Sequence, residues 1–202
     1  MARAAGSVGT VRIVGGALRG RRLRVPDAGV RPTSERVREA VFDILGAAVR
    51  DAAVLDLYAG TGAYGVEALS RGAARAEFVE GDRIVAAGIA AGLETLGLGP
   101  EVARVHVADL GAGVLPADVR GPFRLVFLDP PYEGEDGVRW LRELARRDRL
   151  EPRGILVYER RRGDAPAAPE ALRLATERRY GDTTIAIYRL DGPEGPPMEG
   201  GT

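Results

Sequence analysis

The sequence predicts an α/β protein with a doubly wound, seven-stranded, mainly parallel sheet that resembles the Rossmann fold. Short apolar runs alternate with stretches of helical spacing between residues 53 and 158, which is the order that β-α-β units produce. Runs at 172–179 and 183–190 flank Gly181-Asp182 and predict a terminal antiparallel hairpin. The chain of 202 residues, 45% hydrophobic, is long enough for one domain with a substantial core.

The composition excludes several classes of site. Cysteine is absent and there is one histidine, which rules out disulfides, thiolate chemistry and a histidine metal cluster. No apolar stretch reaches the roughly 18 residues of a membrane span, and the first ten residues lack the core of a signal peptide. We expect a cytoplasmic monomer without a metal.

The N-terminal segment is strongly basic. Residues 11–14 and 21–25 read as two strands of a small β-hairpin around a glycine-rich turn. Eight arginines stand against two carboxylates between residues 12 and 38. Arginine forks grip phosphate oxygens, so the segment is either a phosphate-binding arm or a solvated hairpin. The candidate RNA contacts are Arg12, Arg19, Arg21, Arg22 and Arg36.

The sequence divides into three parts. We expect residues 1–32 to form the basic hairpin extension, 33–190 the main domain, and 191–202 a disordered tail rich in Gly and Pro. The main domain opens with a helix capped by Thr33 or Ser34 that ends near Gly46. Its apolar face leaves Arg36 and Arg38 on the outside.

A glycine-rich turn follows the apolar run at residues 53–57. The pattern Gly60-x-Gly62-x-x-Gly65 also suits a dinucleotide, but the carboxylate of Asp56 at the mouth of the loop would repel a pyrophosphate. It favours a cation, and S-adenosylmethionine carries an ammonium and a sulfonium. The cofactor contacts that we expect from this loop are Asp56, Tyr58, Ala59, Gly60, Thr61, Gly62 and Gly65.

Two later strand ends carry further cofactor candidates. Glu80 ends the run at 77–80, at the spacing from Gly60 typical of a residue that binds ribose hydroxyls. Asp109 and Leu110 end the run at 102–107, and Asp109 can accept a hydrogen bond from the amino group of an adenine. We expect His106, among apolar neighbours, to pack rather than to act in catalysis.

The motif Asp129-Pro130-Pro131-Tyr132 ends the apolar run at 123–128. Proline stops the strand and holds the preceding residue extended. The Asp129 carboxylate and the Pro130 carbonyl can accept the two N–H groups of an exocyclic amine, while Tyr132 stacks on its ring. The alternative is an ordinary strand-to-loop turn.

The remaining stretch completes the fold. Residues 138–145 read as a helix and 154–158 as a strand, followed by Arg160-Arg161-Arg162, which forms either a solvated edge or an RNA contact. All the acidic candidates stand at strand carboxyl ends, where open α/β sheets bind ligands.

These motifs, in this order, resemble the class I S-adenosylmethionine-dependent amino-methyltransferases. The N-terminal block, with Arg12-Ile13-Val14-Gly15-Gly16, Arg19-Gly20-Arg21, Arg31-Pro32-Thr33 and Arg36-Val37-Arg38-Glu39, is similar to that of the RsmD family. The resemblance covers about residues 12 to 190.

The resemblance implies methylation of the exocyclic N2 of guanine 966 in 16S rRNA, either free or in an assembling small ribosomal subunit. Three rival interpretations remain open. An adenine-N6 methyltransferase acting on DNA or RNA uses the same four-residue motif, and a dinucleotide oxidoreductase uses only the glycine-rich loop. A non-catalytic RNA-binding protein that kept the cofactor fold would function without Asp129.

Overall fold

The protein is represented by a computed structural model that describes residues 8–26, 34–131, 136–146, 148–164 and 167–192. The strands are β1 (Val8–Arg12), β2 (Arg22–Pro26), β3 (Ala53–Leu57), β4 (Arg75–Glu80), β5 (Ala103–Val107), β6 (Phe123–Leu128), β7 (Leu150–Arg161), β8 (Leu172–Tyr180) and β9 (Thr183–Leu190). The α-helices are α1 (Glu35–Leu45), α2 (Ala63–Ser70), α3 (Arg83–Leu96) and α4 (Asp136–Leu144), and the 3₁₀ turns are η1 (Gly46–Val49) and η2 (Leu110–Ala112).

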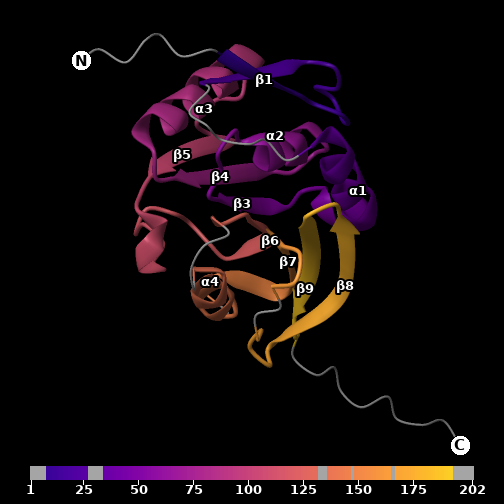
Figure 1. The fold of residues 1–202 in the computed structure, drawn as a ribbon. Coiled ribbons are helices and arrows are strands. Elements are labelled where there is room, and N and C mark those ends of the chain that lie inside the picture. Colours follow the sequence, from indigo (N-terminus) through magenta and orange to yellow (C-terminus); the bar gives the residue numbers. More distant parts are fainter. Residues whose placement is uncertain (1–7, 27–33, 132–135, 147, 165–166, 193–202) are drawn as a thin grey trace, which may run out of the picture.

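Seven strands form one sheet in the order β5-β4-β3-β6-β7-β9-β8 (Figure 1). The first five run parallel, and β9 is antiparallel to both β7 and β8. The predicted fold class is therefore confirmed, including the terminal hairpin. The chain winds from β3 towards β5 on one side and from β6 towards β7 on the other, so its direction reverses between β3 and β6. Ligands bind at such a reversal in open α/β sheets.

Helices cover both faces of the sheet (Figure 1). α1, α2 and α3 pack over one face, in a core that includes Val41, Ile89 and Phe127. α4 packs over the other face, where Trp140 and Leu128 are buried. Apolar residues on the two faces of the central strands account for their almost continuous hydrophobic runs, as expected for a parallel sheet covered on both sides.

The N-terminal hairpin, β1 paired antiparallel with β2, forms a separate two-stranded sheet, as predicted. Its turn presses on the end of α2: a Cβ on Gly16 would lie 1.8 Å from the Ser70 carbonyl oxygen. The Ala17 N–H donates to that oxygen at 2.7 Å. On the other side, Leu23 fills the space above Gly92 of α3. The hairpin is thus docked on two helices rather than extended as a free arm.

The ends of α1 follow the prediction, but its outer face does not. Ser34 caps the helix by accepting a hydrogen bond from the Val37 N–H, and the helix ends at Gly46. Arg38 was expected on the solvent side, and this is wrong: its side chain is 1% exposed and lies 3.6 Å from the buried carboxylate of Glu67. Burial of a guanidinium requires such a charged partner.

The strand after α4 is longer than expected and takes in part of the arginine run. Arg160 is buried in β7, where it pairs with Glu177 of β8, whereas Arg161 and Arg162 are exposed. The interpretation of Arg160 as a solvated edge or RNA contact is therefore wrong. Among the described residues, no helix has the length and apolarity to cross a membrane.

Candidate active site

Four carboxylates lie at the carboxyl ends of neighbouring parallel strands. Asp56 belongs to β3, Glu80 ends β4, Asp129 follows β6 and Glu159 lies near the end of β7. The strand order places β3 and β6 side by side in the middle of this group. The site therefore gathers negative charge at the reversal point of the sheet.

The glycine-rich loop between β3 and α2 is held by Glu80. Gly60 and Gly62 have φ angles of 52° and 71°, which glycine adopts without a steric penalty. The Gly60 N–H donates to Glu80 Oε2 at 2.8 Å, and the Asp82 N–H donates to Glu80 Oε1 at 2.9 Å. Because a carboxylate has about four acceptor positions, Glu80 retains capacity for two ribose hydroxyls.

Asp56 lies deeper than the sequence suggested. Its side chain is 3% exposed, and its Oδ2 accepts a hydrogen bond from the Gly65 N–H at 2.9 Å. Burial raises the pKa of Asp56 to about 7, the Gly65 N–H opposes this shift, and the charge of Glu80 adds to it. Asp56 is thus buried beneath the glycine-rich loop and holds it through the Gly65 N–H, whereas the sequence suggested a position at the loop's outer edge.

Gly65 has a packing role, and its expected contact with the cofactor stays a prediction. A Cβ at this position would lie 2.3 Å from the buried Phe78 ring, and the N–H is already bonded to Asp56. The third glycine of the pattern allows α2 to lie close to β4. Ala59 and Thr61 of the loop are also buried, and Tyr58 is half-buried.

Asp129 adjoins a buried acidic group. Burial raises the pKa of Asp129 well above its usual value, and the charges of Glu159 and Asp56 raise it further. Pro130 is buried and Pro131 is exposed. Tyr132 lies outside the described residues, so its predicted stacking on a base stays a prediction.

Tyr64 and Glu159 complete this acidic group, and neither was singled out from the sequence. The Tyr64 hydroxyl donates to Glu159 Oε2 at 3.2 Å, and the Tyr64 ring stacks on Phe127 with centroids 4.6 Å apart. Burial raises the pKa of Tyr64 well above 10, and the charges of Glu159, Asp129 and Asp56 add to the shift. A signal for Glu159 existed, because it too follows an apolar run at a strand's carboxyl end.

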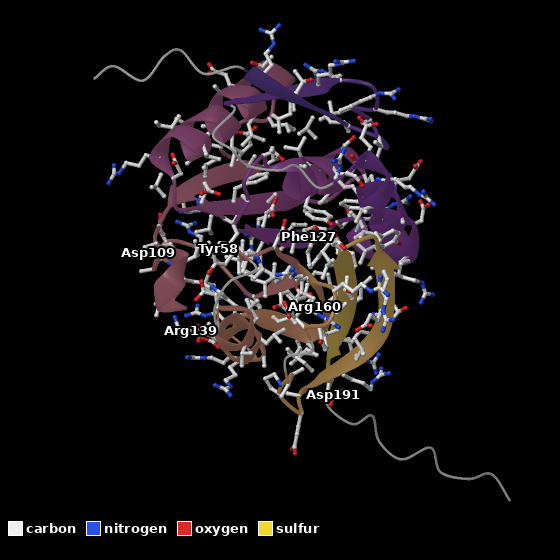
Figure 2. All side chains as sticks on the ribbon, in the orientation of Figure 1. Tyr58, Asp109, Phe127, Arg139, Arg160 and Asp191 are labelled. Carbon is white, nitrogen blue, oxygen red and sulfur yellow. The ribbon has the colours of Figure 1, made fainter. Side chains whose placement is uncertain are left out.

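The far side of the site is built around Tyr58 (Figure 2). Its hydroxyl oxygen accepts from Trp140 Nε1 at 3.0 Å and lies 3.2 Å from Asp136 Oδ2. Trp140 Nε1 also lies 3.1 Å from the Leu110 carbonyl oxygen, which fixes η2 against α4. Asp109 is exposed and caps η2 through the Gly111 N–H at 2.9 Å.

The basic candidates separate into two groups. Arg21 donates to the carbonyl oxygens of Leu96 and Thr95 at 3.1 and 2.9 Å, so it caps the end of α3, a role that the sequence did not suggest. The side chains that remain exposed and are candidates for RNA contacts are Arg12, Arg19, Arg22 and Arg36.

His106 is buried, as expected, but between charges. Its Nε2 lies 2.7 Å from Glu77 and its Nδ1 lies 3.0 Å from Asp118. It stands on edge strand β5, one residue before that strand ends. Among the described residues, no group of three or more acidic or histidine side chains is arranged to hold a metal ion.

A family model described as "Conserved hypothetical protein 95" matches residues 11–189 of the chain. The chain belongs to this family. It is the RsmD family of S-adenosylmethionine-dependent methyltransferases, which confirms the resemblance seen in the N-terminal block and in the four-residue motif.

Individual RsmD relatives agree with this assignment. "Ribosomal RNA small subunit methyltransferase D" of Escherichia coli is 45% identical over 125 residues, which cover 61% of this chain and 61% of the relative. The chain thus matches about three fifths of that relative's length. "Putative rRNA methyltransferase YlbH" of Bacillus subtilis is 34% identical over 185 residues, 90% of this chain and 100% of the relative.

Solved structures show the same fold. The "putative methyltransferase yhhF from Escherichia coli" superposes with a TM-score of 0.81 at 35% identity, covering 91% of this chain and 99% of the other. An RNA methyltransferase from Salinibacter ruber, solved with S-adenosyl-L-homocysteine, has a TM-score of 0.61 at 17% identity and covers 84% of this chain and 98% of its own. The second likeness concerns the fold alone.

Proposed function

We propose that this RsmD-family protein transfers a methyl group from S-adenosylmethionine to the exocyclic N2 of a guanine in 16S rRNA, at the position conventionally numbered 966. The observation that carries the proposal is the convergence of Asp129 and its proline corner with a buried acidic group at the reversal point of the sheet. Relatives named as small-subunit rRNA methyltransferases support the substrate class. We further propose that the protein acts as a cytoplasmic monomer.

The residues of the crevice fit the cofactor by charge and shape. Burial raises the pKa of Asp56, and the charge of Glu80 raises it further, so a cation bound near these two carboxylates would stabilise their charged forms. The same charge disfavours the pyrophosphate of a dinucleotide. Glu80 would bind the ribose, Asp109 and Leu110 would face the adenine, and the backbone around Gly60 and Gly62 would approach the remainder. When bound, the cofactor supplies an electrophilic methyl on its sulfonium.

Asp129 and the Pro130 carbonyl would prepare the nucleophile. The lone pair of an aromatic amine is delocalised into its ring and attacks poorly. Hydrogen bonds from its two N–H groups to these acceptors favour a more pyramidal nitrogen with a directed lone pair. Most of the rate then comes from positioning and electrostatics. After transfer the nitrogen carries an extra proton, which the Asp129 carboxylate can accept because its pKa is raised.

The RNA would be held by the exposed arginines of the hairpin and α1, since guanidinium groups bind phosphate oxygens without reading sequence. The target base must leave its stack to enter the crevice, and Tyr132 would then stack on it. We propose the division at residues 32 and 190 as the boundary between this basic extension, the catalytic domain and the tail.

A tritiated methyl transfer assay on small-subunit particles that lack the modification tests the proposal. We expect label on one guanine, and at least a roughly 100-fold loss of rate in Asp129→Ala with cofactor affinity retained in calorimetry. Asp148→Ala, which removes an exposed carboxylate, is the matched control. Label on an adenine, or lost cofactor affinity in Asp129→Ala, contradicts the assignment.

A further inference from the structure

In the proposed function, Asp129 and the Pro130 carbonyl accept hydrogen bonds from the N2 amine of the target base. No residue has yet been assigned to its neighbouring N1 position. We propose that Glu159 determines base specificity by accepting a hydrogen bond from the N1–H of the target guanine. This inference rests on the proposed function and adds to it a residue that rejects purines with a lone pair at N1.

The sheet places Glu159 beside Asp129. β6 and β7 are parallel, and their last paired residues are Leu128 and Tyr158. Asp129 and Glu159 each come one residue later, so they point to the same face of the sheet from strands about 4.8 Å apart. The charge of Glu159 also acts on Asp129 directly, since it is the largest charge effect on the Asp129 carboxyl. Carboxylates carried by neighbouring strands can both reach donors on one base.

The Glu159 carboxylate is held in place from behind. Tyr64 donates to its Oε2 at 3.2 Å, and the Tyr64 ring is fixed by its stack on Phe127, with only 11° between the ring planes. Phe127 belongs to β6, two residues before Asp129. Glu159 is 6% exposed, so water competes only weakly for its carboxylate. A hydrogen bond to this carboxylate is therefore stronger than one at the surface.

The chemistry of the base then decides what fits. Guanine presents N1–H and N2–H₂ as adjacent donors, whereas 2-aminopurine keeps the 2-amino group but carries a lone pair at N1. An ionised carboxylate can only accept, so it pairs with guanine and repels the N1 of 2-aminopurine. A glutamine in its place offers both an acceptor and a donor. A site that requires a particular hydrogen bond can discriminate strongly against an analogue lacking it.

The test compares guanine with 2-aminopurine at the target position of 16S rRNA, reconstituted into small-subunit particles from ligated RNA segments. For the wild type we expect kcat/KM to favour guanine by roughly 100-fold. In Glu159→Gln, whose amide oxygen still accepts from Tyr64, the preference falls to within about five-fold. Glu151→Gln, at the opposite end of β7, keeps the wild-type preference.

The outcomes separate the two claims. A wild type that methylates guanine and 2-aminopurine equally, or a Glu159→Gln protein that keeps the full preference, overturns the role of Glu159 and leaves the proposed function standing. A wild type inactive on guanine sinks the proposed function itself. If Glu159→Gln does not fold, Tyr64→Phe serves instead: loss of the anchoring hydroxyl is expected to reduce the preference several-fold, and an unchanged preference overturns the inference.

Discussion

Replacing Asp56 by asparagine should make the protein more stable at neutral pH, although the carboxylate accepts a native hydrogen bond. The side chain lies below the glycine-rich loop and is almost fully buried. Asparagine has nearly the same shape, and its Oδ1 can still accept from the Gly65 N–H. The substitution therefore removes the charge while keeping the contact.

The magnitude follows from proton linkage. Folding raises the pKa of Asp56 from 3.8 to about 7, so the folded state binds the proton more tightly than the unfolded state does. As pH rises from about 4 to 7, the wild type loses free energy of unfolding at up to about 1.4 kcal/mol per pH unit, about 4 kcal/mol in total as an upper bound. The asparagine side chain of the variant does not titrate. The variant should thus be close to the wild type near pH 4 and more stable by roughly 2–4 kcal/mol at pH 8.

Urea denaturation of both proteins at half-unit steps from pH 4 to 8 measures this difference. Titration of the other groups largely cancels in the comparison, and a matched Asp148→Asn variant, altered at an exposed carboxylate, should show no such trend. The difference in free energy of unfolding between Asp56→Asn and the wild type should grow with pH in favour of the variant. A difference that does not change with pH, or that increasingly favours the wild type, would refute the conclusion that burial destabilises the Asp56 carboxylate. Calorimetry on the same variant should show weaker cofactor binding, because one charge that favours a cation is gone.

Three further predictions test other parts of the structure. Gly65→Ala should cost about 1–3 kcal/mol by urea denaturation, because the new methyl overlaps the Phe78 ring; unchanged stability would show that the loop and β4 are not in close contact. Glu67→Ala should cost roughly 3–5 kcal/mol, since it removes the buried carboxylate that pairs with the Arg38 guanidinium. A cost below about 1 kcal/mol in the same assay would contradict the buried ion pair. Arg22→Ala should lower the slope of log affinity for RNA against log salt by about 0.7–0.9, measured by filter binding, whereas Arg21→Ala should mainly loosen the end of α3; equal slopes in Arg22→Ala and the wild type would remove Arg22 from the interface.

The sequence predicted the sheet well because strand ends are marked locally. Gly81 and Asp129 directly follow the runs that became β4 and β6, Gly60 lies three residues after the end of β3, and Phe123–Leu128 was recovered with its exact bounds. Element order then implied parallel pairing, and general rules for α/β sheets indicated the carboxyl ends of the strands as the candidate ligand site. Asp56, Glu80 and Asp129 were found in this way without any knowledge of tertiary contacts.

The two misplaced arginines share one cause, which is that charge was taken as a sign of exposure. Arg38 fits the apolar stripe of α1 by spacing, since Val41, Phe42 and Leu45 follow at three, four and seven residues, but its charge led to the opposite interpretation. The partner that permits its burial, Glu67, lies on a different helix, and no local pattern reveals it. Arg160 was misplaced in the same way, because its partner belongs to a later strand.

The packing role of Gly65 and the place of Glu159 were missed because both depend on contacts between elements. The glycine pattern predicts backbone approach to a ligand, but whether the third glycine faces a ligand or a neighbouring strand depends on how α2 packs against Phe78. Glu159 directly follows an apolar run, as the other acidic candidates do, but its strand continues to Arg161 and no glycine or proline marks an end there. The run of arginines after it drew attention to basic residues instead.

The docking of the hairpin has a consequence for how RNA would be presented. Glu67 of α2 accepts a hydrogen bond from the Val14 N–H at 2.9 Å and pairs with both Arg38 of α1 and Arg71. Both basic elements are therefore attached to the helix whose N-terminus carries the glycine-rich loop. If the hairpin binds RNA phosphates as proposed, this attachment would hold them at a fixed distance from the bound cofactor. Weakening the contacts of Glu67 with the hairpin and α1 should therefore reduce the rate of methyl transfer more than it reduces RNA affinity. The arginines proposed to bind phosphate would remain, but their distance from the candidate active site would no longer be fixed.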